Sequence, residues 1–239
     1  MMRWMHLRLR APLAAFGGET IDAHGVIRDF PSQSMMTGLL ANAMGWTRAL
    51  RQEHQRLQER IVFGVLWEHH PGLSRLTDYQ TAQLTRNDRA WTTTGRPVGR
   101  QGGLATFRGA HQRWRDYHTD VRMAVVLRLD PADESPALDD VAAAFDRPAR
   151  TLFVGRKSCL PSSPIFQGWV ARAANARAAL REIAPRAASS HLAFWPESEG
   201  TDGAYLTTDV TDERNWLSGL HGGARRLCEG HIAAPQGSE

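Results

Sequence analysis

The stretch VRMAVVLRL, residues 121–129, decides the fold class. Its apolar side chains, interrupted only by two arginines, predict a buried strand. Asp130-Pro131 ends this run, and a helix is expected over about residues 136–145. Residues 151–154, TLFV, then predict a short strand. This part of the chain therefore predicts the order strand, helix, strand.

A second strand, helix and strand precede this part. Residues 4–10 alternate apolar and polar side chains, which predicts a half-buried strand. Ser32 or Ser34 can cap a following helix, and residues 61–67, IVFGVLW, predict a buried strand. The whole order is typical of an α+β, ferredoxin-like βαββαβ domain with an insertion between its second and third strands.

The insertion, about residues 75–120, has an unusual composition. From residue 84 to residue 115 it holds seven arginines, five glycines and three aromatic residues against one acid, Asp88. Few apolar residues are available to fold it independently, so an extended hairpin or a flexible arm is expected. Arginines mixed with aromatics suit an arm that follows a nucleic-acid strand, and a solvated surface loop is the alternative. We expect residues 1–160 to form the domain with this insertion, and residues 161–239 a small, mainly β extension packed on it.

The overall composition limits the possible functions. The chain has 239 residues, of which 42% are hydrophobic, and a net charge of +4; 28 of its 29 basic residues are arginines. A codon bias can produce this arginine content, but arginine also offers a planar fork for phosphate and stacks on bases. The two cysteines are too few for a disulfide framework. Residues 1–10 lack the apolar core of a signal peptide and no run is long enough for a membrane span, so a cytoplasmic protein without membrane partners is expected.

The turn Gly155-Arg156-Lys157-Ser158-Cys159 carries the clearest binding signal. A glycine directly after a strand lets the backbone approach a ligand closely. Two cations and a hydroxyl can then donate to phosphate oxygens. The upstream glycine and following helix of a Walker A loop are missing. The turn therefore predicts an anion site, with an ordinary surface turn as the alternative.

Candidates for catalysis and for metal binding are weaker. His69 and His70 are adjacent and point apart in an extended segment, which argues against a metal site. His111, Tyr117 and His118 could serve metal-independent RNA cleavage, in which a base removes the 2′-OH proton. More often such residues pack or stack. We therefore expect no metal, no cofactor and no catalytic residue, and keep an endoribonuclease acting on repeat RNA as the alternative function.

Four segments of the chain together resemble one family. They are LRLRAPL at 7–13 with FG at 16–17, FPSQS at 30–34 with GLL at 38–40, DYQT at 78–81, and VGRKSCLP at 154–161. This combination is similar to the Cas-five group of RAMP proteins from type I-E CRISPR Cascade complexes. The resemblance covers about residues 5–168 and fades beyond.

The resemblance implies an RRM-like domain whose insertion is an arginine-bearing thumb. Such subunits hold the 5′ handle of the CRISPR RNA (crRNA), contact the backbone (Cas-seven type) subunits and the large subunit that reads the PAM, and meet target DNA indirectly. A type I-C branch instead cuts precursor RNA with a Tyr/Lys/His set. That set is not evident here, because the chain's only lysine, Lys157, is far in sequence from Tyr117 and His118.

The leading hypothesis is thus a non-catalytic RNA-binding subunit of an antiviral ribonucleoprotein. A protein–protein scaffold whose arm docks an acidic partner is a further alternative. The candidate RNA-binding residues are Arg8, Arg10, Arg28, Pro31, Ser32, Gln33, Ser34, Tyr79, Arg86, Arg89, Arg96, Arg100, Arg108, Gly155, Arg156, Lys157, Ser158 and Cys159.

Overall fold

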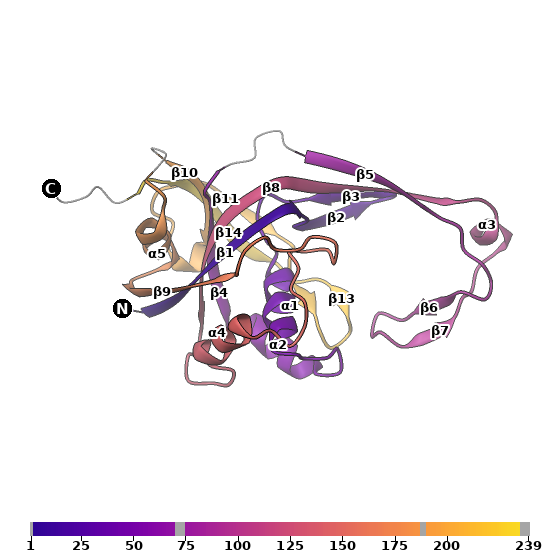
Figure 1. Cartoon of the computed structure of the whole chain (residues 1–239), viewed down its shortest axis with the longest axis horizontal. Coiled ribbons are helices and arrows are strands. Elements are labelled where there is room, and N and C mark those ends of the chain that lie inside the picture. Colours follow the sequence, from indigo (N-terminus) through magenta and orange to yellow (C-terminus); the bar gives the residue numbers. More distant parts are fainter. Residues whose placement is uncertain (1, 70–74, 187–189, 235–239) are drawn as a thin grey trace.

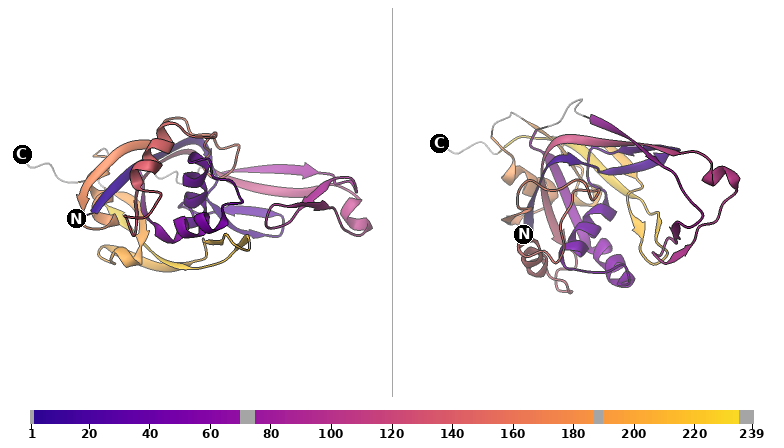
Figure 2. Two further views of the ribbon diagram at one scale, coloured as in Figure 1. Left: turned by 90° about the horizontal axis from the view of Figure 1, so that it is seen from below. Right: turned by 45° about the vertical axis from the view of Figure 1, so that its right-hand side comes forward.

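A computed structural model describes residues 2–69, 75–186 and 190–234. It is a mixed α/β structure built around one curled sheet, from which a long arm projects (Figure 1). Helices α1 (Gln33–Ala43), α2 (Arg51–Arg60) and α4 (Leu138–Asp146) lie on one face of the sheet, and α5 (Ala176–Ile183) lies on the other (Figures 1 and 2). Within the described residues, none of the helices is both long and apolar enough to cross a membrane.

The centre of the sheet has the strand order β4-β8-β1-β9, and all neighbours are antiparallel. Two helices lie between β1 and β4 in the chain, and one lies between β8 and β9. The bounds are β1 Met2–Ala14, α1 Gln33–Ala43, α2 Arg51–Arg60, β4 Ile61–Trp67, β8 His111–Leu129, α4 Leu138–Asp146 and β9 Phe166–Ala173. The predicted strands at 4–10, 61–67 and 121–129 and the two helices beginning near residues 33 and 138 are confirmed.

The C-terminal part extends the sheet beyond β4, in the order β11-β14-β10-β4. Its helix α5 packs on the face of the sheet opposite α1. The bounds are α5 Ala176–Ile183, β10 His191–Pro196, the 3₁₀ turn η1 Glu197–Glu199, β11 Ala204–Val210, β12 Arg214–Asn215, β13 Leu220–His221 and β14 Arg225–Ile232. Residues 161–239 therefore supply strands at both ends of this sheet, because β9 pairs with β1 and β10 pairs with β4.

The arm (residues 75–118) is a long hairpin. Strand β5 (Arg75–Ala82) pairs with the first half of β8, from Arg75 opposite His118 to Ala82 opposite His111. The far end carries β6 (Arg89–Trp91), β7 (Pro97–Gly99) and the short helix α3 (Leu104–Phe107). At the base of the arm, the hairpin of β2 (Gly17–Ile21) and β3 (His24–Ile27) pairs with β8. The insertion thus lies where the sequence predicts it, between the second and third central strands.

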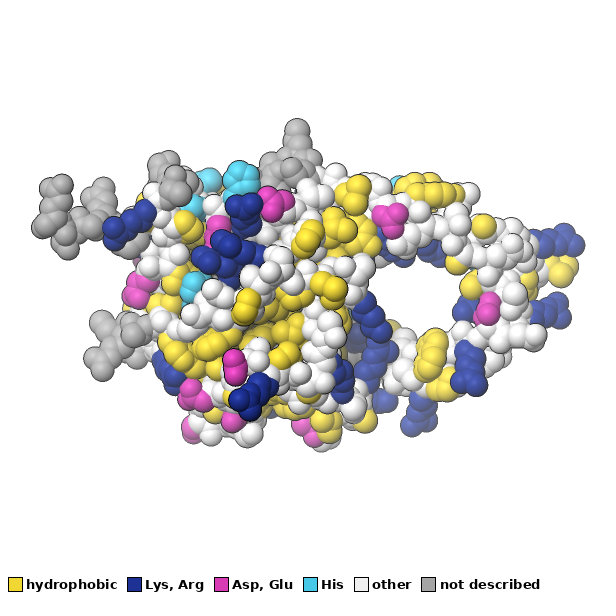
Figure 3. Space-filling view, viewed as in Figure 1, with side chains coloured by type: hydrophobic (Ala, Val, Ile, Leu, Met, Phe, Trp, Pro, Cys, Tyr) yellow, Lys and Arg dark blue, Asp and Glu magenta, His cyan; other side chains and the backbone are white. Residues whose placement is uncertain are grey.

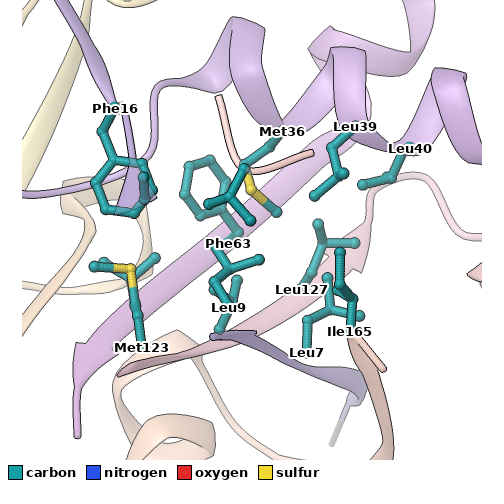
Figure 4. Close-up of a cluster of buried hydrophobic side chains, with 14 of the residues drawn as sticks. Leu7, Leu9, Phe16, Met36, Leu39, Leu40, Phe63, Met123, Leu127 and Ile165 are labelled. Carbon is teal, nitrogen blue, oxygen red and sulfur yellow. The ribbon is translucent and has the colours of Figure 1, made fainter. Parts of the chain in front are cut away.

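The core between the sheet and α1 holds the structure together. Leu7 and Leu9 of β1 are fully buried against Met36 and Leu40 of α1 and Leu127 of β8 (Figure 4). Each such side chain contributes about 1.5–3 kcal/mol on burial. Because residues alternate along a strand, the same packing directs residues 6, 8 and 10 of β1 to the opposite face.

The predicted strand at residues 151–154 is wrong, and β9 takes its place as the fourth central strand. Leu152 and Val154 are buried, which explains the strand-like pattern. The Val154 carbonyl instead accepts from the Ala15 N–H at 3.2 Å, and the Val154 N–H donates to the Cys159 carbonyl at 2.7 Å. The backbone is thus used to close a turn and not to join the sheet.

Candidate nucleic-acid interface

The turn at residues 155–159 is fixed by close backbone packing. Gly155 has φ +93°, and a Cβ added there would lie 2.0 Å from the Ala15 carbonyl oxygen, so only glycine fits. The Cys159 N–H donates to the Arg156 carbonyl at 2.9 Å. The Cys159 side chain is fully buried, and burial raises the pKa of its thiol. Gly155 and Cys159 therefore shape the turn, and the Cys159 side chain lies out of reach of a surface ligand.

Arg156 connects this turn to the base of the arm. Its guanidinium donates to the Asp116 carbonyl at 2.9 Å and to the Gly25 carbonyl at 3.2 Å, and lies 4.6 Å from the centre of the Tyr117 ring. Lys157 and Ser158 are exposed at the tip of the turn. The turn thus presents the Lys157 ammonium and the Ser158 hydroxyl to solvent, and Arg156 fixes the orientation of the turn.

A groove of about 970 Å³ opens beside the turn and is strongly basic. Its cations come from separate segments of the chain: Arg48, Arg150, Arg156, Lys157 and Arg214. Among the described residues that line it, none is an aspartate or a glutamate. Without a neutralising carboxylate, the positive potentials of these side chains add, which favours a polyanion in the groove.

Aromatic rings form the far wall of this groove. Trp46, His54 and Trp216 line it together, with the His54 ring 5.5 Å from that of Trp46 and 4.7 Å from that of Trp216. Burial lowers the pKa of His54, and burial together with Arg214 lowers the pKa of His221. A lowered pKa favours the neutral form of both imidazoles at pH 7, which leaves an uncharged aromatic wall beside the cations. Such a combination suits stacked bases with a phosphate backbone.

The start of α1 borders the groove, and its residues have different roles there. The Ser32 hydroxyl caps the helix by accepting from the Met35 N–H at 3.1 Å. Ser32 and Ser34 line the groove. Gln33 is buried, and its amide donates to the carbonyls of Gln58 and Ile61 at 2.9 and 2.8 Å. Pro31 is also buried, so Pro31 and Gln33 support the helix and the two serines face the groove.

Arg8 and Arg10 do not share this groove. They project from the face of β1 opposite the buried Leu7 and Leu9. Glu68, largely buried, accepts from Arg8 at 2.5 Å and from Arg10 at 3.4 Å. Strand alternation therefore places them on the other face of the sheet, outside the groove. Their contact with RNA remains a prediction.

Arg28 is also used structurally. Its guanidinium donates to the Thr211 carbonyl at 2.9 Å and lies 3.9 Å from the Glu19 carboxylate. It thereby connects the loop before α1 to the C-terminal part of the chain. Arg28 is not among the residues that line the groove.

The arginines of the arm lie away from the groove walls. Arg86, Arg89, Arg96 and Arg108 are exposed near the end of the arm, and Arg100 donates to the Arg89 carbonyl at 3.0 Å. Tyr79 of β5 is half exposed and packs on Trp114 of β8, with ring centres 5.3 Å apart. Tyr79 and Trp114 share the face of the arm opposite the one that carries Tyr117, because the register pairs them directly.

The three residues considered for RNA cleavage do not come together. His111 lies at the far end of the β5–β8 hairpin and contacts the Thr106 carbonyl. Tyr117 and His118 are buried and, as neighbours on β8, point to opposite faces. Across the part of the chain that the structure describes, no group of three His, Cys, Asp or Glu residues is placed to hold a metal ion. His69 is exposed, and His70 lies outside the described residues.

Several groove residues were not predicted from the sequence. Trp46, Arg48 and His54 belong to the connection into α2 and its first turn, whereas Arg214 and Trp216 come from the C-terminal part. The segment Gly45-Trp46-Thr47-Arg48 carries a weak signal of its own, a cation and an aromatic beside a glycine. For Arg214 and Trp216 no local signal exists, because only tertiary folding brings them to α2.

Comparisons with known proteins agree on one group. A family model described as CRISPR-associated protein Cas5 matches residues 4–228. The chain is 28% identical over 174 residues to the CRISPR system Cascade subunit CasD of Escherichia coli (strain K12), covering 70% of this chain and 71% of that protein.

Two solved structures share the fold. A chain of a structure titled CRISPR RNA-guided surveillance complex superposes with a TM-score of 0.66 at 19% identity, covering 97% of this chain and 91% of that one. A chain of a structure titled Crystal structure of Cas protein superposes with a TM-score of 0.61 at 18% identity, covering 98% of both. At these identities the likeness concerns the mixed α/β fold with its curled sheet.

Proposed function

The chain belongs to the Cas5 family of CRISPR-associated proteins, and we propose that it is the RNA-binding subunit of a type I-E Cascade complex that holds the 5′ handle of the crRNA. In this role it caps the foot of the complex, contacts the backbone subunits and the large PAM-reading subunit, and meets target DNA indirectly. The relative named CasD is itself a Cascade subunit. We expect a subunit of such a complex to act in the cytoplasm.

One observation carries the proposal: five cations and no carboxylate line the groove beside the turn, among the residues that the structure describes. A charge-assisted hydrogen bond to phosphate contributes about 1.5–3 kcal/mol. A few such bonds, with bases stacked on Trp46 or Trp216, suffice to hold a short single strand. This chemistry grips RNA without cleaving it, so we assign the subunit no catalytic residue.

The strand order supports the proposed domain type. The sheet order is β4-β8-β1-β9, and helices follow β1 and β8 in the chain. This arrangement supports our proposal of a ferredoxin-like, RRM-like RAMP domain. In this proposal residues 1–160 and the edge strand β9 form that domain, with the arm as its thumb. The remainder of residues 161–239 is a β-rich extension that contributes Arg214 and Trp216 to the groove.

Replacing the exposed cation of the turn tests this function. Lys157→Ala should weaken binding of a handle RNA by about 10-fold or more, because one charge-assisted contact contributes about 1.5–3 kcal/mol. The log–log salt dependence should become shallower by about 0.7 for the one phosphate released. Fluorescence anisotropy with labelled handle RNA, at several salt concentrations, measures both quantities.

Arg147→Ala is the matched control for this measurement. Arg147 follows α4, its side chain is 93% exposed, and it does not line the groove. Its replacement removes the same charge and should leave the affinity and the salt slope close to those of the wild type. Equal effects of the two substitutions would contradict the role of the groove.

The alternative function, cleavage of repeat RNA, has a direct test. The full chain is incubated with repeat RNA in EDTA and the products are separated on a denaturing gel. We expect no cleavage, because Tyr117 and His118 are buried and His111 lies far along the arm. A product that disappears in His118→Ala or Tyr117→Phe would favour the endoribonuclease instead.

A further inference from the structure

The end of the arm folds back and contacts the body of the protein. The Thr93 hydroxyl, between β6 and β7, donates to the Ser218 carbonyl at 3.1 Å. Gly219 packs so closely on the Thr93 carbonyl that an added Cβ would lie 2.3 Å from that oxygen. On the neighbouring side, Gly95 faces Arg48, with 3.5 Å between an added Cβ and the guanidinium. We call the contact of Thr93 with Ser218 and Gly219 the latch.

Both partners in the latch are ordered turns. On the body, the Ser218 N–H donates to Asn215 Oδ1 at 2.9 Å, and Arg214 donates to the Gly219 carbonyl at 2.9 Å. On the arm, the Gly95 N–H donates to the Thr92 carbonyl at 2.9 Å. Because each turn is closed by its own hydrogen bonds, the two surfaces can meet and separate without refolding.

The loop that carries the body side of the latch also contributes residues to the groove. Trp216 donates through its indole N–H to Gln58 Oε1 at 2.9 Å, which ties the loop at residues 215–221 to α2. Trp216 and Arg214 line the groove, and Arg214 is the residue that supports Gly219. The contact therefore joins the arm to one wall of the RNA groove.

The arm and the body consequently form a closed ring. Figure 3 shows an opening through the molecule, bounded by the body on one side and the arm on the other, with Lys and Arg side chains on both sides of it. Residues 113, 115 and 117 share one face of β8, and Tyr117 on that face packs against Arg156 of the turn. The side of the arm that faces the turn thus also carries Arg113 and Arg115.

The charges around the opening specify the class of ligand. The side of the arm that faces the turn carries Arg113 and Arg115, and the groove on the body contributes Arg48, Lys157 and Arg214 without a carboxylate among its described lining residues. A polyanion is the complement of such a surface. The aromatic wall of Trp46 and Trp216 favours a nucleic acid with unpaired bases over an acidic peptide.

We propose that the RNA strand passes through this ring, so that the latch encloses it and the strand does not merely lie on an open surface. This inference rests on the proposed function, since it describes how the same groove holds its RNA. Enclosure predicts that the strand dissociates either by sliding out along its length or by opening of the latch. It also predicts that a strand without free ends can enter only while the latch is open.

Covalent closure of the latch tests the enclosure. Thr93→Cys with Ser218→Cys places one thiol on each side of the contact, and a short bismaleimide joins them; the native cysteines, Cys159 and Cys228, are buried. The control pair is Thr81→Cys with Gln112→Cys, which lie opposite each other on β5 and β8. Crosslinking that pair ties the arm to itself and leaves the latch free to open.

The probes are a linear handle RNA and a circular RNA that contains the same sequence. After closure of the latch, the linear RNA should bind, and the circular RNA should lose at least about 10-fold in affinity, the equivalent of one lost charge-assisted contact. Circular RNA added before closure should stay bound in high salt until a nuclease cuts it. The control pair should bind both RNAs like the uncrosslinked protein.

Three results would overturn the inference that the ring encloses the RNA. Equal binding of circular RNA before and after closure would mean that the RNA lies outside the ring. Failure of the protein with Thr93→Cys and Ser218→Cys to react with the crosslinker, when the control pair does react, would mean that the latch does not form. If the uncrosslinked protein binds neither RNA, the proposed function itself is wrong, and the ring has no RNA to enclose.

Discussion

Replacing Gly155 with alanine should destabilise the whole protein. At φ +93° an alanine is strained by about 1–2 kcal/mol. Its Cβ would also lie 2.0 Å from the Ala15 carbonyl oxygen. To reach a normal contact, the turn must move away from Ala15, which breaks the hydrogen bond from the Ala15 N–H to the Val154 carbonyl. With about 0.5–1.5 kcal/mol for this hydrogen bond added to the strain, the expected loss is about 1.5–3.5 kcal/mol in the free energy of unfolding.

Urea denaturation followed by tryptophan fluorescence measures this loss. Gly99→Ala is the control, because an added Cβ there meets no atom within 4 Å and the backbone is not left-handed. It should change the free energy of unfolding by less than about 0.5 kcal/mol. A Gly155→Ala protein that is as stable as the control would refute the view that close packing against Ala15 requires glycine in the turn.

Two further predictions concern stability away from the turn. Glu68→Gln should lower the free energy of unfolding by about 1–2 kcal/mol, because it removes the carboxylate that Arg8 and Arg10 share. Fluorescence anisotropy should show an unchanged RNA affinity. A clear loss of RNA binding would indicate that these two arginines belong to the RNA interface. Burial lowers the pKa of His54 in the folded protein below its ordinary value of 6.5. On acidification, His54 in the unfolded chain therefore binds a proton at a higher pH than in the folded protein, and the free energy of unfolding should fall as the pH drops below about 6.5. His54→Gln should make the decline of Tm on acidification from neutral pH shallower, and an unchanged decline would exclude His54 as a source of the acid sensitivity.

The central strands could be predicted because their patterns are local. Residues 61–67 and 121–129 are apolar runs of strand length, and residues 4–10 alternate, so each determines its own conformation and buried face. The polar first half of β8, residues 111–120, gives no such signal. It becomes a strand because β5 pairs with it along the arm.

The binding site could be predicted only in part. The turn at residues 155–159 is visible as a glycine followed by two cations and a hydroxyl. Alternation also shows that Arg8 and Arg10 share a face, but the position of α1 determines which face borders the groove. Arg214 and Trp216 reach the groove through the contacts of their loop with α2. Side chains brought together in this way leave no common sequence pattern.

The most direct test of the central claim is to identify which peptides touch the RNA. Handle RNA with 5-iodouridine in place of uridine crosslinks to nearby aromatic side chains under ultraviolet light, and mass spectrometry then identifies the modified residues. If the groove holds the RNA, crosslinks should fall on Trp46 or Trp216. Crosslinks confined to other aromatic residues, such as Trp169 or Tyr205, would contradict the assignment of RNA binding to the groove.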